Sequence, residues 1–136
     1  MIPSSNARFN TLLERLERDF SGFRFKSGRK FAFRPPKTIV IGLEEPRELL
    51  ILHEVGHALL SHRFFGTDVE RLKMEVAAWE KAKELASTYG VEIDEEVIQG
   101  ELDTYRDWLH KKSRCPSCGL TRFQTPDGVY HCPACN

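Results

Sequence analysis

The chain has 136 residues, enough for one domain with a modest hydrophobic core and a small appendage. Its 20 basic and 20 acidic residues cancel, so the net charge gives no general attraction to nucleic acid or to anionic lipid. No apolar run approaches the roughly 20 residues that cross a bilayer, and the N-terminus carries no apolar core of signal-peptide type. We therefore expect a cytoplasmic protein without a membrane partner.

The charges are distributed unevenly along the chain. Between Ser21 and Leu43 there are six basic residues and no acid, whereas between Val91 and Thr104 there are six acids and no base. The basic residues are Arg24, Lys26, Arg29, Lys30, Arg34 and Lys37. They could bind phosphate backbones or an acidic substrate, although a solvated sheet face is the simpler interpretation.

The N-terminal part predicts one helix and a small sheet. Residues 6–20 place apolar side chains at helical spacing, which predicts an amphipathic helix. Residues 23–26 and 31–33 alternate phenylalanine with polar or small residues around a Ser27-Gly28 turn, which predicts a β-hairpin with one buried face. The β-branched run Thr38–Leu43 predicts a third strand.

Helices dominate the rest of the chain. Residues 48–62, ELLILHEVGHALLSH, are apolar nearly all round and predict a central, buried helix. A second helix is predicted over residues 69–89, ending at Gly90, and a third after Asp94. The expected fold class is α+β, with one domain over residues 1–112 and a metal-binding module over residues 113–136.

The helix over residues 48–62 contains the pattern H-E-x-x-H. His53 and His57 are four residues apart, so both imidazoles lie on one face and can bind one zinc ion. Glu54 lies about 100° away around the helix, where it misses the metal but can reach a zinc-bound water as a general base. The alternative is a pair of core histidines beside a surface glutamate, but burying these groups without partners would be costly.

A catalytic zinc of this kind needs a third protein ligand. His62 projects about 140° away from His57, so it can share the metal only if the helix ends before it. On the next helix, Glu75 falls in the middle of an otherwise apolar stripe, which includes Trp79. A buried salt bridge could also explain an acid there, but the set His53, His57 and Glu75 matches the two-histidine, one-glutamate catalytic type.

These motifs resemble the ImmA/IrrE-type metallopeptidases, which are close to the minimal gluzincins. The resemblance covers roughly residues 5–110 and rests on the order of elements, on H-E-V-G-H and on E-V-A-A-W, which supplies Glu75 and Ala78. It implies a zincin-like domain, Glu75 as the third zinc ligand and Glu54 as general base and acid. It also implies cleavage of peptide bonds in a protein substrate, for which a DNA-binding regulator is a possible target.

The same resemblance implies two further features of the active site. The strand Thr38–Leu43 would edge the cleft and pair with an extended substrate. A tyrosine or histidine would stabilise the transition state, and Tyr105, His110 and Tyr89 are the candidates. One departure from the family is the metal-binding tail, which replaces a longer C-terminal part.

The C-terminal module contains two C-x-x-C pairs separated by 13 residues: Cys115 and Cys118, then Cys132 and Cys135. Four thiolates form a closed tetrahedral site, so this pattern predicts a zinc ribbon with a structural ion. A module this short would not fold without its metal. The sequence thus predicts two zinc ions, one catalytic and one structural.

Two alternative functions remain open at this stage. One is an SprT-like protease that acts on DNA-bound protein, although the third histidine of that family is absent. The other is a non-catalytic adaptor in which both metals are structural, which leaves Glu54 without a role. In each case the ribbon could position a substrate or a partner.

Overall fold

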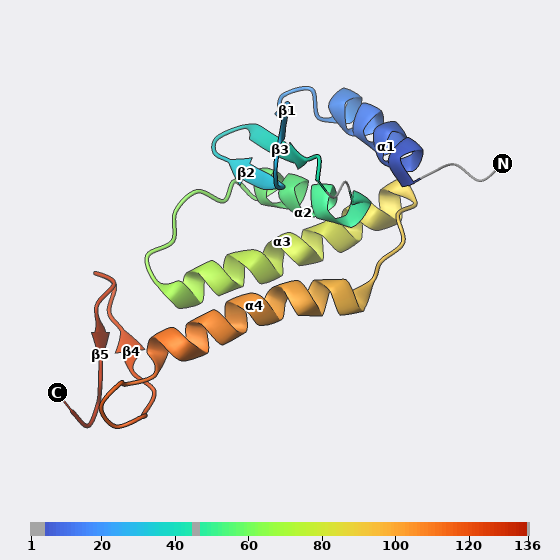
Figure 1. The fold of residues 1–136 in the computed structure, drawn as a ribbon. Coiled ribbons are helices and arrows are strands. Elements are labelled where there is room, and N and C mark those ends of the chain that lie inside the picture. The colour runs from blue at the N-terminus through green and yellow to red at the C-terminus, as the bar shows by residue number, and fades with distance from the viewer. Residues whose placement is uncertain (1–4, 45–46, 136) are drawn as a thin grey trace. The chain divides into compact units, whose positions relative to one another are not determined.

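The computed structural model describes residues 5–44 and 47–135 and shows a mixed α+β chain (Figure 1). The predicted helices and strands are all present, and so the α+β class is confirmed. In chain order the elements are α1 (Ser5–Asp19), β1 (Arg24–Gly28), β2 (Ala32–Arg34), β3 (Thr38–Gly42), α2 (Glu48–Leu59), α3 (Asp68–Tyr89), α4 (Glu95–Ser113), β4 (Phe123–Gln124) and β5 (Tyr130–His131).

The chain forms two compact units, and the boundary between them cuts through α3. One unit contains α1, the three-stranded sheet, α2 and the part of α3 that begins at Ala77. The other contains the part of α3 up to Val76, α4 and the β4–β5 hairpin. The division at residue 112 that the sequence suggests stays a prediction.

The predicted hairpin is wrong in its pairing. The strand order is β1-β3-β2, so β3 lies between the two strands that were expected to pair with each other (Figure 1). β3 is parallel to β1 and antiparallel to β2. Because β1 pairs with the whole of Thr38–Gly42 and β2 pairs with Thr38–Val40, β3 is the central strand and not an edge strand, and the role that the resemblance implies for it is corrected.

A close approach at Gly42 explains how the chain passes from β1 to β2. The connecting residues cross the end of β3, where a Cβ on Gly42 would lie 2.8 Å from the backbone nitrogen of Phe31 and 3.1 Å from the carbonyl carbon of Lys30. Local alternation of apolar and polar residues gives the same pattern for a hairpin and for this crossover. The pattern therefore predicts the strands but not their order.

Helix α2 forms the centre of the first unit. It packs against β2 and β3, and α1 packs against α2. Its residues from Ile51 to Ala58 are all buried, while α1 contributes Phe9, Leu12 and Leu16 to the core. None of the helices in the described parts of the chain is long and apolar enough to cross a membrane.

Candidate metal centres

The side chains of His53, His57 and Glu75 form the first candidate metal centre. One possible ligand atom from each lies within 4.8 Å of the others. All three residues are buried, with 8% of each residue exposed. Two imidazoles and a carboxylate at this spacing could hold one metal ion.

Two neighbours fix the first histidine of this group. The indole of Trp79 stacks on the His53 ring, with the ring centroids 4.1 Å apart and the planes 4° from parallel. Glu54 Oε1 lies 3.5 Å from His53 Nδ1, and Glu54 is itself buried. Since Nδ1 faces Glu54, Nε2 is the nitrogen of His53 that remains to bind a metal. The buried Glu54 carboxylate lies beside the candidate metal centre, where it can accept or donate a proton.

His57 has a neighbour that the sequence did not predict. Its Nδ1 lies 2.9 Å from Nδ1 of His62, within hydrogen-bonding distance. The reason is that α2 ends at Leu59, earlier than expected. His62 is therefore not on the helix and can fold back toward His57. It contacts the candidate ligand instead of pointing away from it.

A close approach of the backbone holds α2 against α3. A Cβ on Gly56 would lie 2.6 Å from the carbonyl oxygen of Ala78, a separation that real Cβ atoms do not show. Gly56 and Ala78 are both buried. Gly56 thus allows the backbone of α3 to approach closely, and the motifs H-E-V-G-H and E-V-A-A meet at this point.

Glu75 is positioned by residues of its own unit. Tyr105, on α4, hydrogen-bonds to Glu75 and to Arg71, which lies one helical turn before Glu75. Burial and the Glu75 carboxylate raise the pKa of Tyr105, while Arg71 lowers it in part. The phenol therefore stays protonated and can donate to Glu75. The Arg71 guanidinium lies 5.3, 5.4 and 5.2 Å from the ring centroids of Phe65, Tyr105 and Trp108.

The other two candidates for a transition-state stabiliser lie in different surroundings. The Tyr89 hydroxyl donates to Asp19 Oδ2 at 2.6 Å, and Arg15 lies over its ring, so this side chain joins the end of α3 to α1. His110 is exposed on α4. Of the three, Tyr105 is the one that contacts a candidate metal ligand.

The four cysteines form the second candidate metal centre. Cys115 Sγ lies 3.9 Å from Cys135 Sγ, and Cys118 Sγ lies 3.6 Å from Cys132 Sγ. A tetrahedral zinc with Zn–S bonds of about 2.3 Å spaces its sulfurs about 3.8 Å apart. Disulfide sulfurs lie about 2.05 Å apart, so these pairs are not disulfides. The spacing fits a closed four-thiolate site.

Backbone amides point at two of these sulfurs. The amides of Ala134 and Cys135 lie 3.4 and 3.3 Å from Cys132 Sγ, and they lower the pKa of this thiol. Amides of Cys118 and Ser117 lower the pKa of Cys115 to about 6. The first cysteine of each C-P-x-C turn thus favours the thiolate, the form that binds metal, whereas the neighbouring sulfurs raise the pKa of Cys135 to about 12.

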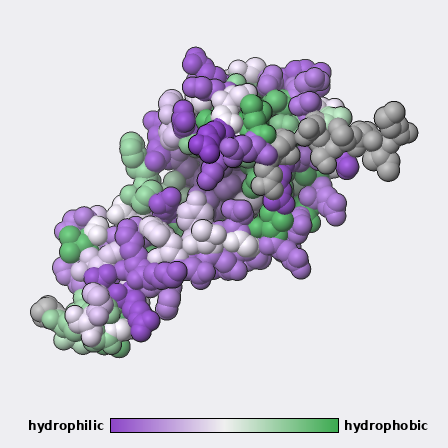
Figure 2. All heavy atoms as spheres, viewed as in Figure 1, coloured by the Kyte–Doolittle hydropathy of each residue, from purple (hydrophilic) through white to green (hydrophobic). Residues whose placement is uncertain are grey.

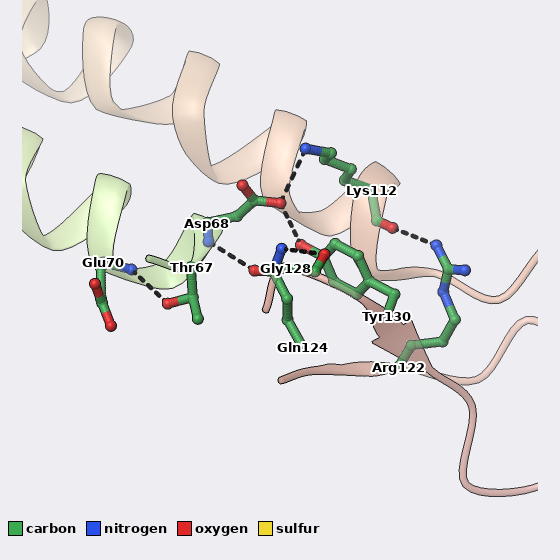
Figure 3. Close-up of polar contacts among 8 residues, drawn as sticks. All are labelled: Thr67, Asp68, Glu70, Lys112, Arg122, Gln124, Gly128 and Tyr130. Carbon is green, nitrogen blue, oxygen red and sulfur yellow. Dashed lines mark hydrogen bonds and ion pairs between the residues drawn. The ribbon is translucent and has the colours of Figure 1, made fainter. Parts of the chain in front are cut away.

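The ribbon is anchored to the start of α3 through Asp68, as Figure 3 shows. Asp68 Oδ2 accepts a hydrogen bond from the Tyr130 hydroxyl at 2.7 Å and pairs with Lys112 Nζ at 3.1 Å. Its backbone amide donates to Gln124 Oε1 at 2.7 Å. Burial alone would raise the pKa of Asp68, but these partners outweigh burial and lower it. Asp68 therefore links both ribbon strands to the helix that carries Glu75, β5 through its buried carboxylate and β4 through its backbone amide.

Comparisons with protein-family models, curated proteins and solved structures found no match. The two candidate metal centres are therefore the features of the chain that bear on its function.

Proposed function

We propose that this chain is a zinc-dependent endopeptidase of gluzincin type, with a zincin-like fold around His53, His57 and Glu75. The observation that carries the proposal is the burial of Glu54 beside two imidazoles and a carboxylate that can share one ion. A structural metal site would use this carboxylate only to orient His53, whereas a catalytic site also needs a general base. The ion type also follows from the ligands, since two imidazoles with one carboxylate suit zinc.

The donor set fits a catalytic zinc ion. Three protein ligands leave a fourth position open, in contrast to the four cysteines of the ribbon. A bound zinc ion would polarise the substrate carbonyl and make water more acidic. The three ligand residues are buried, which keeps bulk water from competing with these interactions.

The roles of the side chains follow from their positions. Glu54 takes a proton from the attacking water and then passes it to the leaving amine, as general base and acid. His53 is held by the Trp79 stack and His57 by the contact with His62. Tyr105 donates a hydrogen bond to Glu75 and so orients the third ligand. The ribbon carries a structural zinc ion, and positions a substrate or a partner.

The test is cleavage of a peptide library prepared from a whole-cell digest by the zinc-loaded full-length chain, with mass spectrometry as the readout. We expect defined cleavage sites and a loss of about 10²- to 10⁴-fold in rate for Glu54→Gln, the usual contribution of general acid–base catalysis. Glu80→Gln is the matched control, because Glu80 is exposed on α3 and lies outside the group.

Two results would contradict the proposal. One is the absence of cleavage by a chain shown by elemental analysis to hold both metals. The other is equal cleavage by wild type and by Glu54→Gln, since the activity would then come from a contaminant. Either result would favour the adaptor, in which both metals are structural.

A further inference from the structure

The basic segment between Ser21 and Leu43 has no role in the proposed peptidase reaction. The strand register shows where its cations lie. Arg24 and Arg34 are both register partners of Thr38, one on each side of the central strand. Residues in register share a face of the sheet, and residues two apart along a strand share it too, so Lys26 lies on the same face. Together these three cations form what we call the basic face.

The opposite face of the sheet has different chemistry. Its central row is Phe25, Ile39 and Phe33, and Ile39 is fully buried. The sheet therefore has an apolar side toward the core and a cationic side, on which Arg24, Lys26 and Arg34 are all exposed. Figure 2 shows that the surface over the strands is mostly hydrophilic in this view, with small apolar areas.

The cations of the basic face form no ion pair with any acid that the structure describes. In the described parts of the chain, Arg29 pairs with Glu44, whereas no ion pair involves Arg24, Lys26, Arg34 or Lys37. By contrast, three cations on the helices are paired: Lys81, Lys83 and Arg106 each lie within 3.4 Å of an acid on their own helix. The net charge of zero thus conceals a local surplus of positive charge.

A hollow lies beside the basic face. It is lined by Arg24, Lys37 and Thr38, together with Pro36 and the turn Ser21–Phe23. The Arg24 amide donates to the Lys37 carbonyl at 2.8 Å, which fixes the two cationic residues side by side. A concave site with a guanidinium, an ammonium and two hydroxyls offers the donors that phosphate oxygens accept.

We propose that the basic face and this hollow bind the phosphate backbone of a nucleic acid. Roughly 9–10 Å separates the backbones of Arg24 and Arg34, two strand spacings apart, so the extended cations can contact several phosphates along one strand of nucleic acid. Recognition is through the backbone, because the face presents charges without a groove-reading helix. The partially exposed Phe23 at the hollow adds an aromatic surface, which suits unpaired bases.

The test is binding of fluorescein-labelled 20-nucleotide DNA, single-stranded and duplex, to the full zinc-loaded chain by fluorescence anisotropy. At low salt we expect binding in the micromolar range, weakening steeply as salt rises. The triple variant Arg24→Gln/Lys26→Gln/Arg34→Gln should bind at least about tenfold more weakly. Its slope of log K against log salt should be shallower by up to about 3, at about 0.9 for each phosphate that the variant no longer neutralises.

The matched control is Lys81→Gln/Lys83→Gln/Arg106→Gln, which removes the same charge from cations that are paired on helices. It should bind almost as wild type does. Equal losses of affinity in the two triple variants would mean that only net charge matters and would overturn the proposal. Glu54→Gln should leave DNA binding unchanged, so the result is independent of the peptidase proposal.

Two other outcomes would also contradict the proposal that the basic face binds nucleic acid. If Lys111→Gln/Arg114→Gln loses more affinity than the basic-face variant, the nucleic acid binds the ribbon instead. If the chain sediments with phosphatidylserine vesicles but does not bind DNA, the partner is a membrane surface. Circular dichroism spectra that match wild type confirm that each variant is folded, as expected for exposed side chains.

Discussion

Nδ1 of His57 lies 2.9 Å from Nδ1 of His62, and a turn at the end of α2 makes this contact possible. The His62 amide donates to the His57 carbonyl at 3.1 Å, and the Ser61 amide donates to the Ala58 carbonyl at 3.1 Å. This is the Schellman pattern, in which Ser61 has a φ of 56°. One reversal of the chain therefore both ends the helix and brings a second imidazole against a candidate ligand.

This contact should strengthen metal binding at His57. If His57 offers Nε2 to zinc, its Nδ1 carries the proton and donates to His62, which fixes the ring and makes it a better ligand. We expect His62→Ala to weaken zinc binding at this centre by roughly 10- to 100-fold, measured by competition with a chelator. His110→Ala, which removes an exposed histidine, is the control. Unchanged affinity in His62→Ala would mean that His62 only completes the turn.

The turn itself should be strained at Ser61. The left-handed region costs a non-glycine residue about 1–2 kcal/mol, so Ser61→Gly should raise the free energy of unfolding by about 1 kcal/mol. Gly90, with φ 70° at the end of α3, provides the reverse experiment, because a Cβ there would meet nothing within 4 Å. Gly90→Ser should therefore lower stability by a similar amount. Urea unfolding measures both, and equal effects of the same sign would refute the argument.

Two other glycines should respond in opposite directions to alanine. Gly56→Ala drives a Cβ into the carbonyl oxygen of Ala78, and the overpacking should cost about 1–3 kcal/mol. Gly100 lies in α4 with nothing within 4 Å of a Cβ, so Gly100→Ala should stabilise the chain by about 0.5–1 kcal/mol. Thermal unfolding of both variants provides the comparison. A neutral Gly56→Ala would show that α2 and α3 are not in tight contact.

The sequence predicted the elements of the fold well because its signals for them are local. Apolar spacing located α1, α3 and α4, alternation located β1 and β2, and a β-branched run located β3. The order β1-β3-β2 was not predictable, because strand pairing depends on contacts between distant residues. The end of α2 was missed for a different reason: the left-handed residue that ends a helix is usually glycine, and here it is Ser61.

The candidate metal ligands of the first centre could be predicted from the sequence, but the residues that contact them could not. Helical geometry alone placed His53 and His57 on one face and Glu75 on the inner face of α3, and the structure brings the three together. Their role as zinc ligands stays a prediction. His62 and the stack of Trp79 on His53 were not predicted, because they depend on a turn and on how two helices pack.

Metal content should divide between the two centres. The two groups predict two zinc ions per chain, one from His53, His57 and Glu75 and one from the cysteines. Cys118→Ser and His57→Ala should each lose one ion, and the double variant should lose both, as measured by elemental analysis after removal of loosely held metal. If the His57→Ala protein holds as much zinc as wild type, the group of His53, His57 and Glu75 does not bind zinc.

Two tyrosines, Tyr89 and Tyr130, should ionise at unusually high pH. Burial and a hydrogen bond to Asp19 raise the pKa of Tyr89 to about 12, and burial and a hydrogen bond to Asp68 raise that of Tyr130 to about 12. Because folding favours the protonated phenols, their contribution to stability is complete below the unfolded pKa of about 10 and is lost as pH rises through about 12.

Tyrosinate absorbance should therefore develop mainly above pH 10 in the folded chain, and near pH 10 in urea. Asp68→Asn should lower the pKa of Tyr130 and leave that of Tyr89 unchanged. If both tyrosines of the folded chain ionise near pH 10, neither hydroxyl is buried against its carboxylate.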